Sequence, residues 1–302
     1  MIDTTAAPTI STEEQETSLL GITIIIVLLG LCGLVGNAIV IWLLRFGIKK
    51  SPYSVYIFNL AIADFLFLLC TVLSGVLHRP EFGFWANYVS EVFLRISFLV
   101  YTLGLSLLAT ISLQRCLSVL FPIWYQNHRP KHLSSLVCTI LWILAILENL
   151  VAIYFCVMRK DYRDLCHSID WFFAIVILGV FTPLMCASSL ILFIKVQKFS
   201  KRRKEKRLYI IILITTLVFL ICALPLTVYW FILYWITMDR RLKKIFFDVA
   251  TIFSCVNSTA NPIIYFMVGS QNKRRFHEPL KVVLKRALWE EEMSPPETIR
   301  LG

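Results

Sequence analysis

Seven long apolar stretches, separated by short polar segments, are the feature that most constrains this chain. The first runs from residue 17 to residue 44 without one charged side chain. A helix that crosses the hydrocarbon core of a bilayer needs about 20 apolar residues. The other six stretches cover residues 53–77, 92–120, 134–155, 171–194, 208–236 and 245–268. We therefore predict an all-α membrane protein, a bundle of seven transmembrane helices.

Composition excludes most other classes of protein. The chain is 58% hydrophobic, with a mean hydropathy of +0.74 and only 16% charged residues. Soluble domains carry charge on about a quarter of their residues. An aqueous enzyme, a coiled coil and a disordered regulator are all incompatible with a chain this apolar.

The ends and the loop charges predict topology. The first stretch is too long for a signal peptide, and no basic segment precedes it. If the N-terminus is outside, roughly two-thirds of the 30 Lys and Arg residues lie on the cytoplasmic side. Membrane proteins usually carry their excess of Lys and Arg in cytoplasmic loops, so this orientation is favoured. We predict a multi-pass plasma-membrane protein with an extracellular tail (1–18), a transmembrane domain (19–268), a cytoplasmic amphipathic helix (269–289) and a disordered tail (290–302).

Two predicted inner segments are suited to lipid. The basic run at residues 201–207 lies beside an anionic inner leaflet, where contact with lipid is a simpler explanation than nucleic-acid binding. Residues 271–289 place apolar side chains on one helical face and Lys and Arg elsewhere, the pattern of a helix lying on the inner membrane surface. We expect membrane lipids, and no nucleic acid, as partners.

The nine cysteines divide by their predicted location. Seven lie inside predicted helices or at their inner ends, where small buried residues are ordinary. Cys156 and Cys166 fall in the predicted second outer loop, on the oxidising side of the membrane. We predict a disulfide between them, worth about 2–4 kcal/mol.

Polar residues occur midway in three spans: Asn37 in the first, Asp64 in the second, and Asn257 and Ser258 in the seventh. Placing a charge or an amide there costs roughly 2.5–3.5 kcal/mol. We interpret these residues as a connected polar core with a function in signalling. The alternative is that they only hold the helices together by hydrogen bonds.

These residues belong to a pattern that resembles the rhodopsin-like G-protein-coupled receptors. It consists of Gly36-Asn37, Leu60-Ala61-Ile62-Ala63-Asp64, Arg115, Trp142, Pro183, Phe219 with Pro225, and Asn261-Pro262-Ile263-Ile264-Tyr265. The resemblance covers residues 19 to about 288 in the right order. It implies a receptor without enzymatic activity or cofactor, which an extracellular agonist switches on to activate heterotrimeric G proteins, with arrestin as a further partner.

Within that class, residues 114–125, His128-Arg129-Pro130 and residues 266–270 are similar to the Mas-related receptors, a sensory family. Those receptors also pair a fourth-helix cysteine with a second-loop cysteine, here Cys156 and Cys166. Ala223 stands where most receptors carry a tryptophan switch. Gln114 replaces the acidic neighbour of Arg115, as in the member D (β-alanine-responsive) branch of the family.

The resemblance also implies roles in activation. Arg115 would donate hydrogen bonds to the C-terminus of a Gq or Gi protein once the sixth helix swings outward. Phe219 and Pro225 would form the packing block and hinge of that movement, and Asn261, Pro262 and Tyr265 would bridge the rearranged core. Because Gln114 cannot restrain Arg115 by charge, we predict appreciable basal signalling.

Receptors of this class commonly hold a sodium ion beside the second-helix aspartate, here Asp64. Asn257, Ser258 and Asn261 are available as further ligands, but Gly104 occupies the position that usually supplies a serine. We predict no metal centre and leave sodium at Asp64 open.

The predicted outer mouth carries Arg95 and Asp170, which resemble ligand-binding residues of the β-alanine-responsive branch. A guanidinium for a carboxylate and a carboxylate for an ammonium suit a small zwitterion. Alternatively, the two residues pair with each other, or Arg95 extends to water. Phe98 and Trp230 would line the same site or serve as ordinary packing.

Two alternatives to an amino-acid receptor stay open. Other Mas-related receptors use a fourth-helix glutamate for cationic peptides; Ala152 has that spacing here, and Glu148 lies about one turn deeper. A receptor for cationic peptides or amines is therefore the nearer alternative. A small-solute transporter is the remote one, because the spans show no convincing internal repeat.

Overall fold

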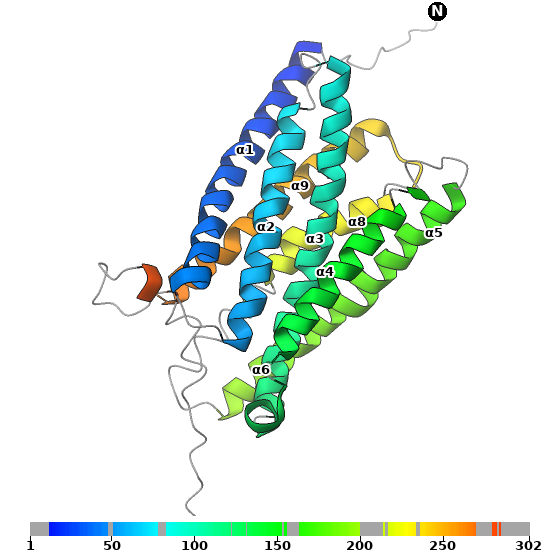
Figure 1. Ribbon diagram of the computed structural model, residues 1–302. Helices are drawn as coiled ribbons and strands as arrows, with labels where there is room; N and C mark the ends of the chain where they lie inside the picture. Colours follow the sequence, from blue (N-terminus) through cyan, green and yellow to red (C-terminus); the bar gives the residue numbers. More distant parts are fainter. Residues whose placement is uncertain are drawn as a thin grey trace, which may run out of the picture.

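The computed structural model describes residues 12–47, 51–77, 83–121, 123–130, 132–152, 154–155, 163–199, 214, 217–233, 236–269, 280–282 and 284. Within this part of the chain, all regular structure is helical. Figure 1 shows long helices running side by side in one bundle.

The helical segments form seven columns in the order predicted from the sequence. The first four columns are α1 (Thr12–Trp42) with η1 (Leu43–Gly47), then α2 (Pro52–Leu77), α3 (Gly83–Leu120) and α4 (Leu133–Ala152), with η3 (Trp124–His128) between α3 and α4. The fifth column joins α5 (Arg163–Ala174), η6 (Ile175–Phe181) and α6 (Thr182–Phe199). The sixth joins η7 (Phe219–Ala223), α8 (Leu224–Val228) and η8 (Tyr229–Leu233), and the seventh is α9 (Arg240–Gly269).

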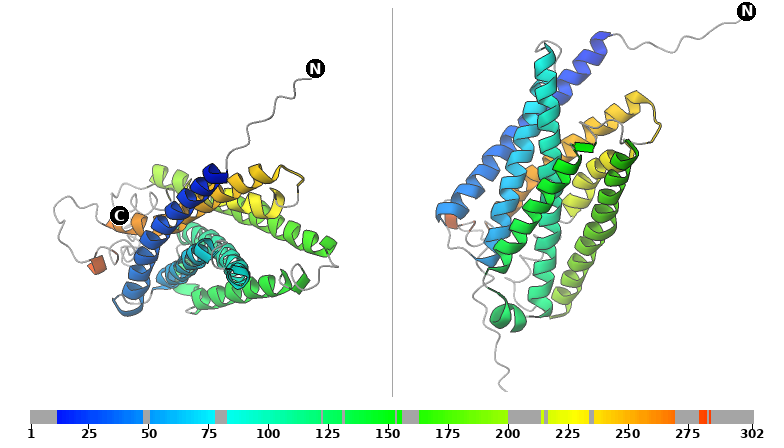
Figure 2. Two further views of the ribbon diagram at one scale, coloured as in Figure 1. Left: turned by 90° about the horizontal axis from the view of Figure 1, so that it is seen from above. Right: turned by 45° about the vertical axis from the view of Figure 1, so that its right-hand side comes forward.

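Helix α3 forms the centre of the bundle. Of its central apolar window 72% is buried, against 28% for the window of α1 and 17% for that of α4. Figure 2 shows α3 near the middle when seen from above, with α1 on one side and α4 and α5 on the other. The exposed apolar side chains of α1 and α4, such as Leu28 and Leu144, cover an outer surface suited to lipid. Four described helical stretches, at 20–47, 52–77, 88–118 and 133–152, are long and apolar enough to cross a membrane.

Prolines explain the irregular fifth and sixth columns. Pro183 and Pro225 lack an N–H group, so neither can continue an α-helical hydrogen-bond ladder. Each follows a π-helical segment, η6 or η7, in which the ladder changes register. In the fifth column, Thr182 donates its hydroxyl to the carbonyl of Ile177 at 3.0 Å and satisfies an acceptor at the change of register.

Glycines allow α1 to lie close to α2 and α9. A Cβ atom built on Gly33 would overlap the side chain of Thr259 on α9 and come within 2.5 Å of Leu68 on α2. One built on Gly36 would lie 3.2 Å from the ring of Pro262. Small residues at such contacts let helix backbones approach closely in a membrane.

Helix α5 already begins at Arg163, before the apolar stretch predicted to start at residue 171, so Cys166, which was predicted in a loop, lies on a helix, as does Asp170. The start of apolar sequence marks where the hydrocarbon core begins, whereas a helix can continue into water when one face is polar. Asp164, His167 and Ser168 lie exposed on that first part of α5. The first helix likewise begins at Thr12, before the predicted residue 19.

The predicted inner segments are described only in part. The basic run at 201–207 and the tail at 290–302 lie outside the described residues. In the predicted amphipathic helix, Leu284 is fully buried and the side chain of Lys281 lies beside Gly47, next to the inner end of the first column. The bounds of these segments stay predictions.

Candidate functional site

Hydrogen bonds at the middle of the bundle connect three helices through buried polar groups. Asn37 on α1 donates its amide to the carbonyl of Gly33 at 2.9 Å and to that of Ser258 on α9 at 3.1 Å. Asn261 on α9 donates to the Asp64 carboxylate on α2 at 2.8 Å. All of these side chains are buried, as is Asn257. The structure thus brings the predicted polar-core residues together around α9.

A metal centre built from acidic, histidine or cysteine side chains finds no support in the described part of the chain. No group of three or more such residues able to hold an ion occurs there. At the position where related receptors have a serine, a side chain added to Gly104 would meet no atom within 4 Å. The absence of a metal centre stays a prediction, and sodium at Asp64 stays an open question.

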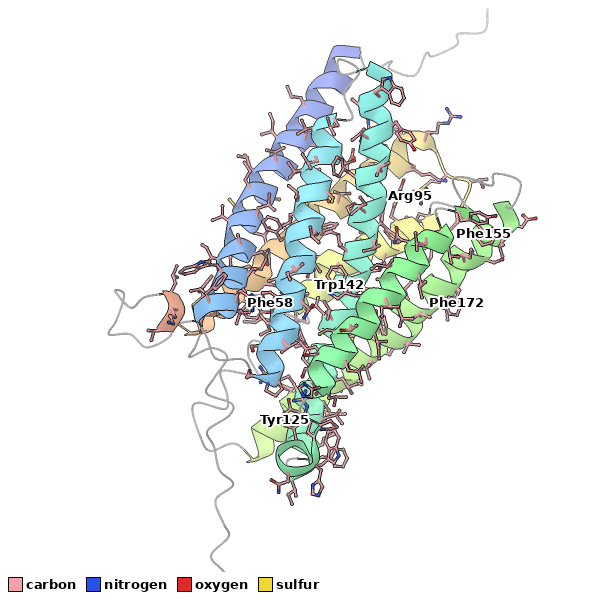
Figure 3. All side chains as sticks on the ribbon, viewed as in Figure 1. Phe58, Arg95, Tyr125, Trp142, Phe155 and Phe172 are labelled. Atoms are coloured by element: carbon pink, nitrogen blue, oxygen red, sulfur yellow. The ribbon has the colours of Figure 1, made fainter. Side chains whose placement is uncertain are left out.

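Helices α2 and α4 are joined by a separate hydrogen bond. The indole of Trp142 donates to the side-chain oxygen of Asn59 at 3.0 Å, and the Asn59 amide donates to the carbonyl of Val55 at 2.8 Å. Trp142, labelled in Figure 3, lies where α4 crosses the middle of the bundle. Helix α4 is otherwise mostly exposed, and this bond fixes its orientation against α2.

The end of the bundle that is predicted to face the cytoplasm, called the inner end below, carries two arginines that lie over tyrosine rings. Arg115 on α3 is only 2% exposed, and its guanidinium carbon lies 3.3 Å from the centre of the Tyr53 ring on α2. Arg129, after η3, lies 4.5 Å over the ring of Tyr125 and donates to the Tyr125 hydroxyl and to Ser134 Oγ at 2.6 and 2.7 Å. Gln114, beside Arg115, is also buried, and so is Tyr265 on α9.

In the half of the bundle that is predicted to face outward, called the outer half below, one face of α3 carries Arg95, Phe98 and Tyr101 at successive intervals of three residues. Residues spaced in this way lie on one side of a helix. Arg95 is half-buried, and the rings of Phe98 and Tyr101 lie 6.4 Å apart. Figure 3 shows Arg95 partway along α3, in the half of the bundle opposite to the end at which Tyr125 lies.

Tyr101 extends this face of α3 to the kink of the sixth column. Its hydroxyl donates to the carbonyl of Ala223, the last residue of η7, and shares a 3.0 Å hydrogen bond with the hydroxyl of Thr227 on α8. Ala223 and Thr227 are fully buried. Tyr101 and Thr227 were not predicted from the sequence, although the spacing from Arg95 through Phe98 to Tyr101 was a usable signal.

The outer end of α3 is fixed to α2 by two serines. Ser74 donates its hydroxyl to the carbonyl of Ser90 at 3.1 Å, and Ser90 donates to the carbonyl of Ser74 at 3.0 Å. These reciprocal bonds anchor this end of α3 to α2. This pair was not predicted from the sequence, because serine is common in membrane helices and carries no motif of its own.

The remaining predicted ligand residues lie on α4, α5 and η8. Asp170 is on α5 and Trp230 on η8, and these two elements contact each other. Helix α3 contacts η6, which continues α5. Glu148 on α4 is half-buried. Helical backbone is described at Asp170, Trp230, Phe219 and Cys166, but their side chains, and all of Cys156, lie outside the described residues, so the predicted disulfide stays a prediction.

The hinge predicted in the sixth column falls at a change of helix type. Phe219 begins η7, and Pro225 lies in the first turn of α8. A switch from π-helical to α-helical hydrogen bonding is a common feature of functional bends. The position of this change matches the place where the resemblance puts a pivot.

Comparison with known proteins identifies the family. The family model described as "7 transmembrane receptor (rhodopsin family)" matches residues 36–265. Mas-related G-protein coupled receptor member D of Macaca fascicularis is 46% identical over 276 residues, covering 90% of this chain and 86% of the relative. Member D of Homo sapiens is 45% identical over 277 residues, with the same coverage. Member A of Rattus norvegicus is 40% identical over 285 residues, covering 92% of each chain.

These similarities confirm the resemblance found in the sequence, and the identity to member D exceeds that to member A. Receptors of this kind are not enzymes; their partners are an agonist and a G protein, and they cross the plasma membrane several times. The chain therefore belongs to the rhodopsin family of seven-transmembrane receptors and, within it, to the Mas-related G-protein-coupled receptors.

Proposed function

We propose that this receptor, with its N-terminus outside the cell, binds a small zwitterionic amino acid such as β-alanine at its outer mouth. Arg95 binds the carboxylate of the ligand through its planar guanidinium, and Asp170 binds the ammonium group. Phe98 and Trp230 line the same site. The Cys156–Cys166 disulfide stabilises the segment that leads into α5.

One observation carries this proposal: the α3 face that begins at Arg95 ends in the hydrogen bond from Tyr101 to Ala223 at the sixth-column kink. Phe98 lies between them on the same face. A ligand that shifts Arg95 therefore acts on a continuous row of side chains leading to the hinge. Such a ligand needs only to bind the active arrangement better than the resting one.

Activation then proceeds at the inner end. The sixth column pivots at Phe219 and Pro225, and Arg115 donates to the C-terminus of a Gq or Gi protein. Asn261, Pro262 and Tyr265 on α9 accommodate the rearranged core, and the polar core of Asn37, Asp64, Asn257 and Ser258 transmits the change. Gln114 supplies no charge to hold Arg115, which favours basal signalling. Arrestin binds the same inner face, and membrane lipids contact the amphipathic segment.

A second candidate function has one observation in its favour. A carboxylate oxygen of Glu148 on α4 is buried within the bundle. A buried carboxylate suits a cationic ligand, so a receptor for cationic peptides or amines is the alternative.

The test exposes cells that express the receptor to β-alanine, other small amino acids and cationic peptides, and measures calcium and cyclic AMP. We expect Arg95→Ala to abolish the response to β-alanine, and Arg95→Lys to weaken it at least tenfold because a lysine cannot form the bidentate fork. Arg240→Ala, which removes an exposed arginine at the start of α9, is the matched control and leaves the response unchanged.

Surface expression is measured in parallel for each variant. An unchanged β-alanine dose–response curve in Arg95→Ala overturns the ligand assignment. A response to cationic peptides that depends on Glu148 instead establishes the alternative.

A further inference from the structure

The contact between Arg115 and Tyr53 is the closest approach of a cation to an aromatic ring in the described part of the chain. The guanidinium carbon lies 3.3 Å from the ring centre, against 4.5 Å for Arg129 over Tyr125 and 5.9 Å for Arg45 over Phe46. Tyr53 and Arg115 are both buried. The attraction between a cation and a ring face is strongest where water is excluded.

The first turn of α2 holds the Tyr53 ring in this position. Ser51 precedes the helix and accepts a hydrogen bond at its hydroxyl from the Ser54 backbone at 3.1 Å, while the Ser51 backbone donates to Ser54 Oγ at 2.8 Å. Such reciprocal bonds define a stable helix start. Pro52, at the first helical position, restricts the backbone further. The position of Tyr53 is therefore fixed by the start of α2, independently of its contact with Arg115.

Gln114 shows why an aromatic partner matters here. It stands where most rhodopsin-like receptors carry an acid that restrains the neighbouring arginine, and a neutral amide supplies no charge for that purpose. Within the described residues, the buried side-chain oxygen of Gln114 has no hydrogen-bond partner. The ring of Tyr53 lies directly on the guanidinium instead.

We propose that Tyr53 is a positioning residue that holds Arg115 against α2 in the resting receptor, replacing the restraint that an acidic neighbour provides in related receptors. The G protein competes with the ring for the guanidinium when the receptor becomes active. This proposal rests on the coupling role proposed above for Arg115. Because the ring restrains Arg115, we expect the basal signalling of this receptor to be lower than that of a receptor that lacks both the acid and the ring.

The test compares Tyr53→Leu, which removes the ring but keeps an apolar side chain, with Tyr53→Phe, which removes only the hydroxyl. Each purified receptor, at equal concentration in lipid nanodiscs, is mixed with purified Gq or Gi heterotrimer, and nucleotide exchange is measured without agonist. We expect Tyr53→Leu to raise basal exchange about fivefold, equivalent to about 1 kcal/mol at 1.4 kcal/mol per tenfold change. Tyr53→Phe stays within about twofold of the unmodified receptor, because phenylalanine keeps the ring face.

Two double variants separate this restraint from a merely structural role. Adding Gln114→Glu to Tyr53→Leu restores an acidic neighbour and is expected to return basal exchange to the unmodified level. Adding Arg115→Ala to Tyr53→Leu is expected to reduce exchange to that of the heterotrimer alone. If Tyr53→Leu does not reach the cell surface, Tyr53→Met replaces it, since methionine adapts to irregular spaces.

The outcomes that contradict the proposal are distinct. Unchanged or reduced basal exchange in Tyr53→Leu, or an equal rise in Tyr53→Phe, overturns the restraint by the ring. A rise in Tyr53→Leu that persists when Arg115→Ala is added overturns the coupling role of Arg115 itself.

Discussion

The inner and outer halves of this receptor differ in how far their charged side chains are buried. In the inner half and the middle of the bundle, Asp64, Asn261 and Arg115 are at most 5% exposed, and each has a specific partner on another helix. In the outer half, Arg95 is half-buried and the first turns of α5 expose several polar groups. A polar group surrounded by lipid and protein must be satisfied internally, whereas one at the mouth can exchange water for a ligand.

This difference shows where variation is tolerated. A change in the inner half disturbs hydrogen bonds that hold three helices in register, so it affects folding and coupling together. We expect a change at a half-buried side chain of the outer mouth, such as Arg95, to alter what the receptor recognises and to leave the bundle intact. Tyr101, which is on α3 and bonded to the sixth-column kink, lies at the boundary between the inner half and the outer mouth.

The largest effect is expected where α1, α2 and α9 meet. Gly33→Leu places a side chain where even a Cβ atom overlaps Thr259 and Leu68, so we expect a loss of stability of about 3 kcal/mol, at the upper end of overpacking effects. Gly21→Leu, on the same helix but with no atom within 4 Å, is the control and leaves stability unchanged. Thermal unfolding of purified receptor and surface expression are the measurements; equal melting temperatures for the two variants would contradict the close packing.

A smaller and more selective effect is expected at the boundary. Tyr101→Phe removes the hydroxyl that bonds Ala223 and Thr227 but keeps the ring between Phe67 and Phe98. A hydrogen bond contributes about 1 kcal/mol, so we expect about a fivefold change in the maximal response to β-alanine with its affinity unchanged.

The control for this variant is Thr102→Val, which removes a hydroxyl bonded only within α3, to the carbonyl of Leu99. Binding of labelled β-alanine and nucleotide exchange are measured on the same preparations. If Tyr101→Phe and Thr102→Val behave alike in both assays, Tyr101 does not connect the mouth to the hinge.

The smallest effect is expected at the serine pair. Ser90→Ala removes the hydroxyl bonded to the Ser74 carbonyl, and we expect a loss of stability of about 1 kcal/mol with little change in signalling. Ser106→Ala, whose hydroxyl bonds only the carbonyl of Leu103 one turn away, is the control. A melting temperature for Ser90→Ala that equals that of Ser106→Ala would show that the pair does not stabilise the outer end.

Much of the fold could be predicted because each span must satisfy its own backbone in lipid and therefore appears as a long apolar stretch. The polar core could also be predicted, since Asn37 and Asp64 are conspicuous inside such stretches. The ends of α5 could not, because hydropathy marks the hydrocarbon boundary and not the end of a helix. The contact of Tyr53 with Arg115 and the bond of Tyr101 to a main-chain carbonyl were also unpredictable, because both depend on how two distant helices are rotated against each other.

The most direct test of this account measures nucleotide exchange on purified Gq and Gi heterotrimers by the purified receptor in nanodiscs, over a range of β-alanine concentrations. The account predicts dose-dependent exchange that is lost in Arg95→Ala at the outer mouth and in Arg115→Ala at the inner end, while Arg95→Ala keeps the melting temperature of the unmodified receptor. Exchange that persists in either variant contradicts a signal relayed from the one arginine to the other.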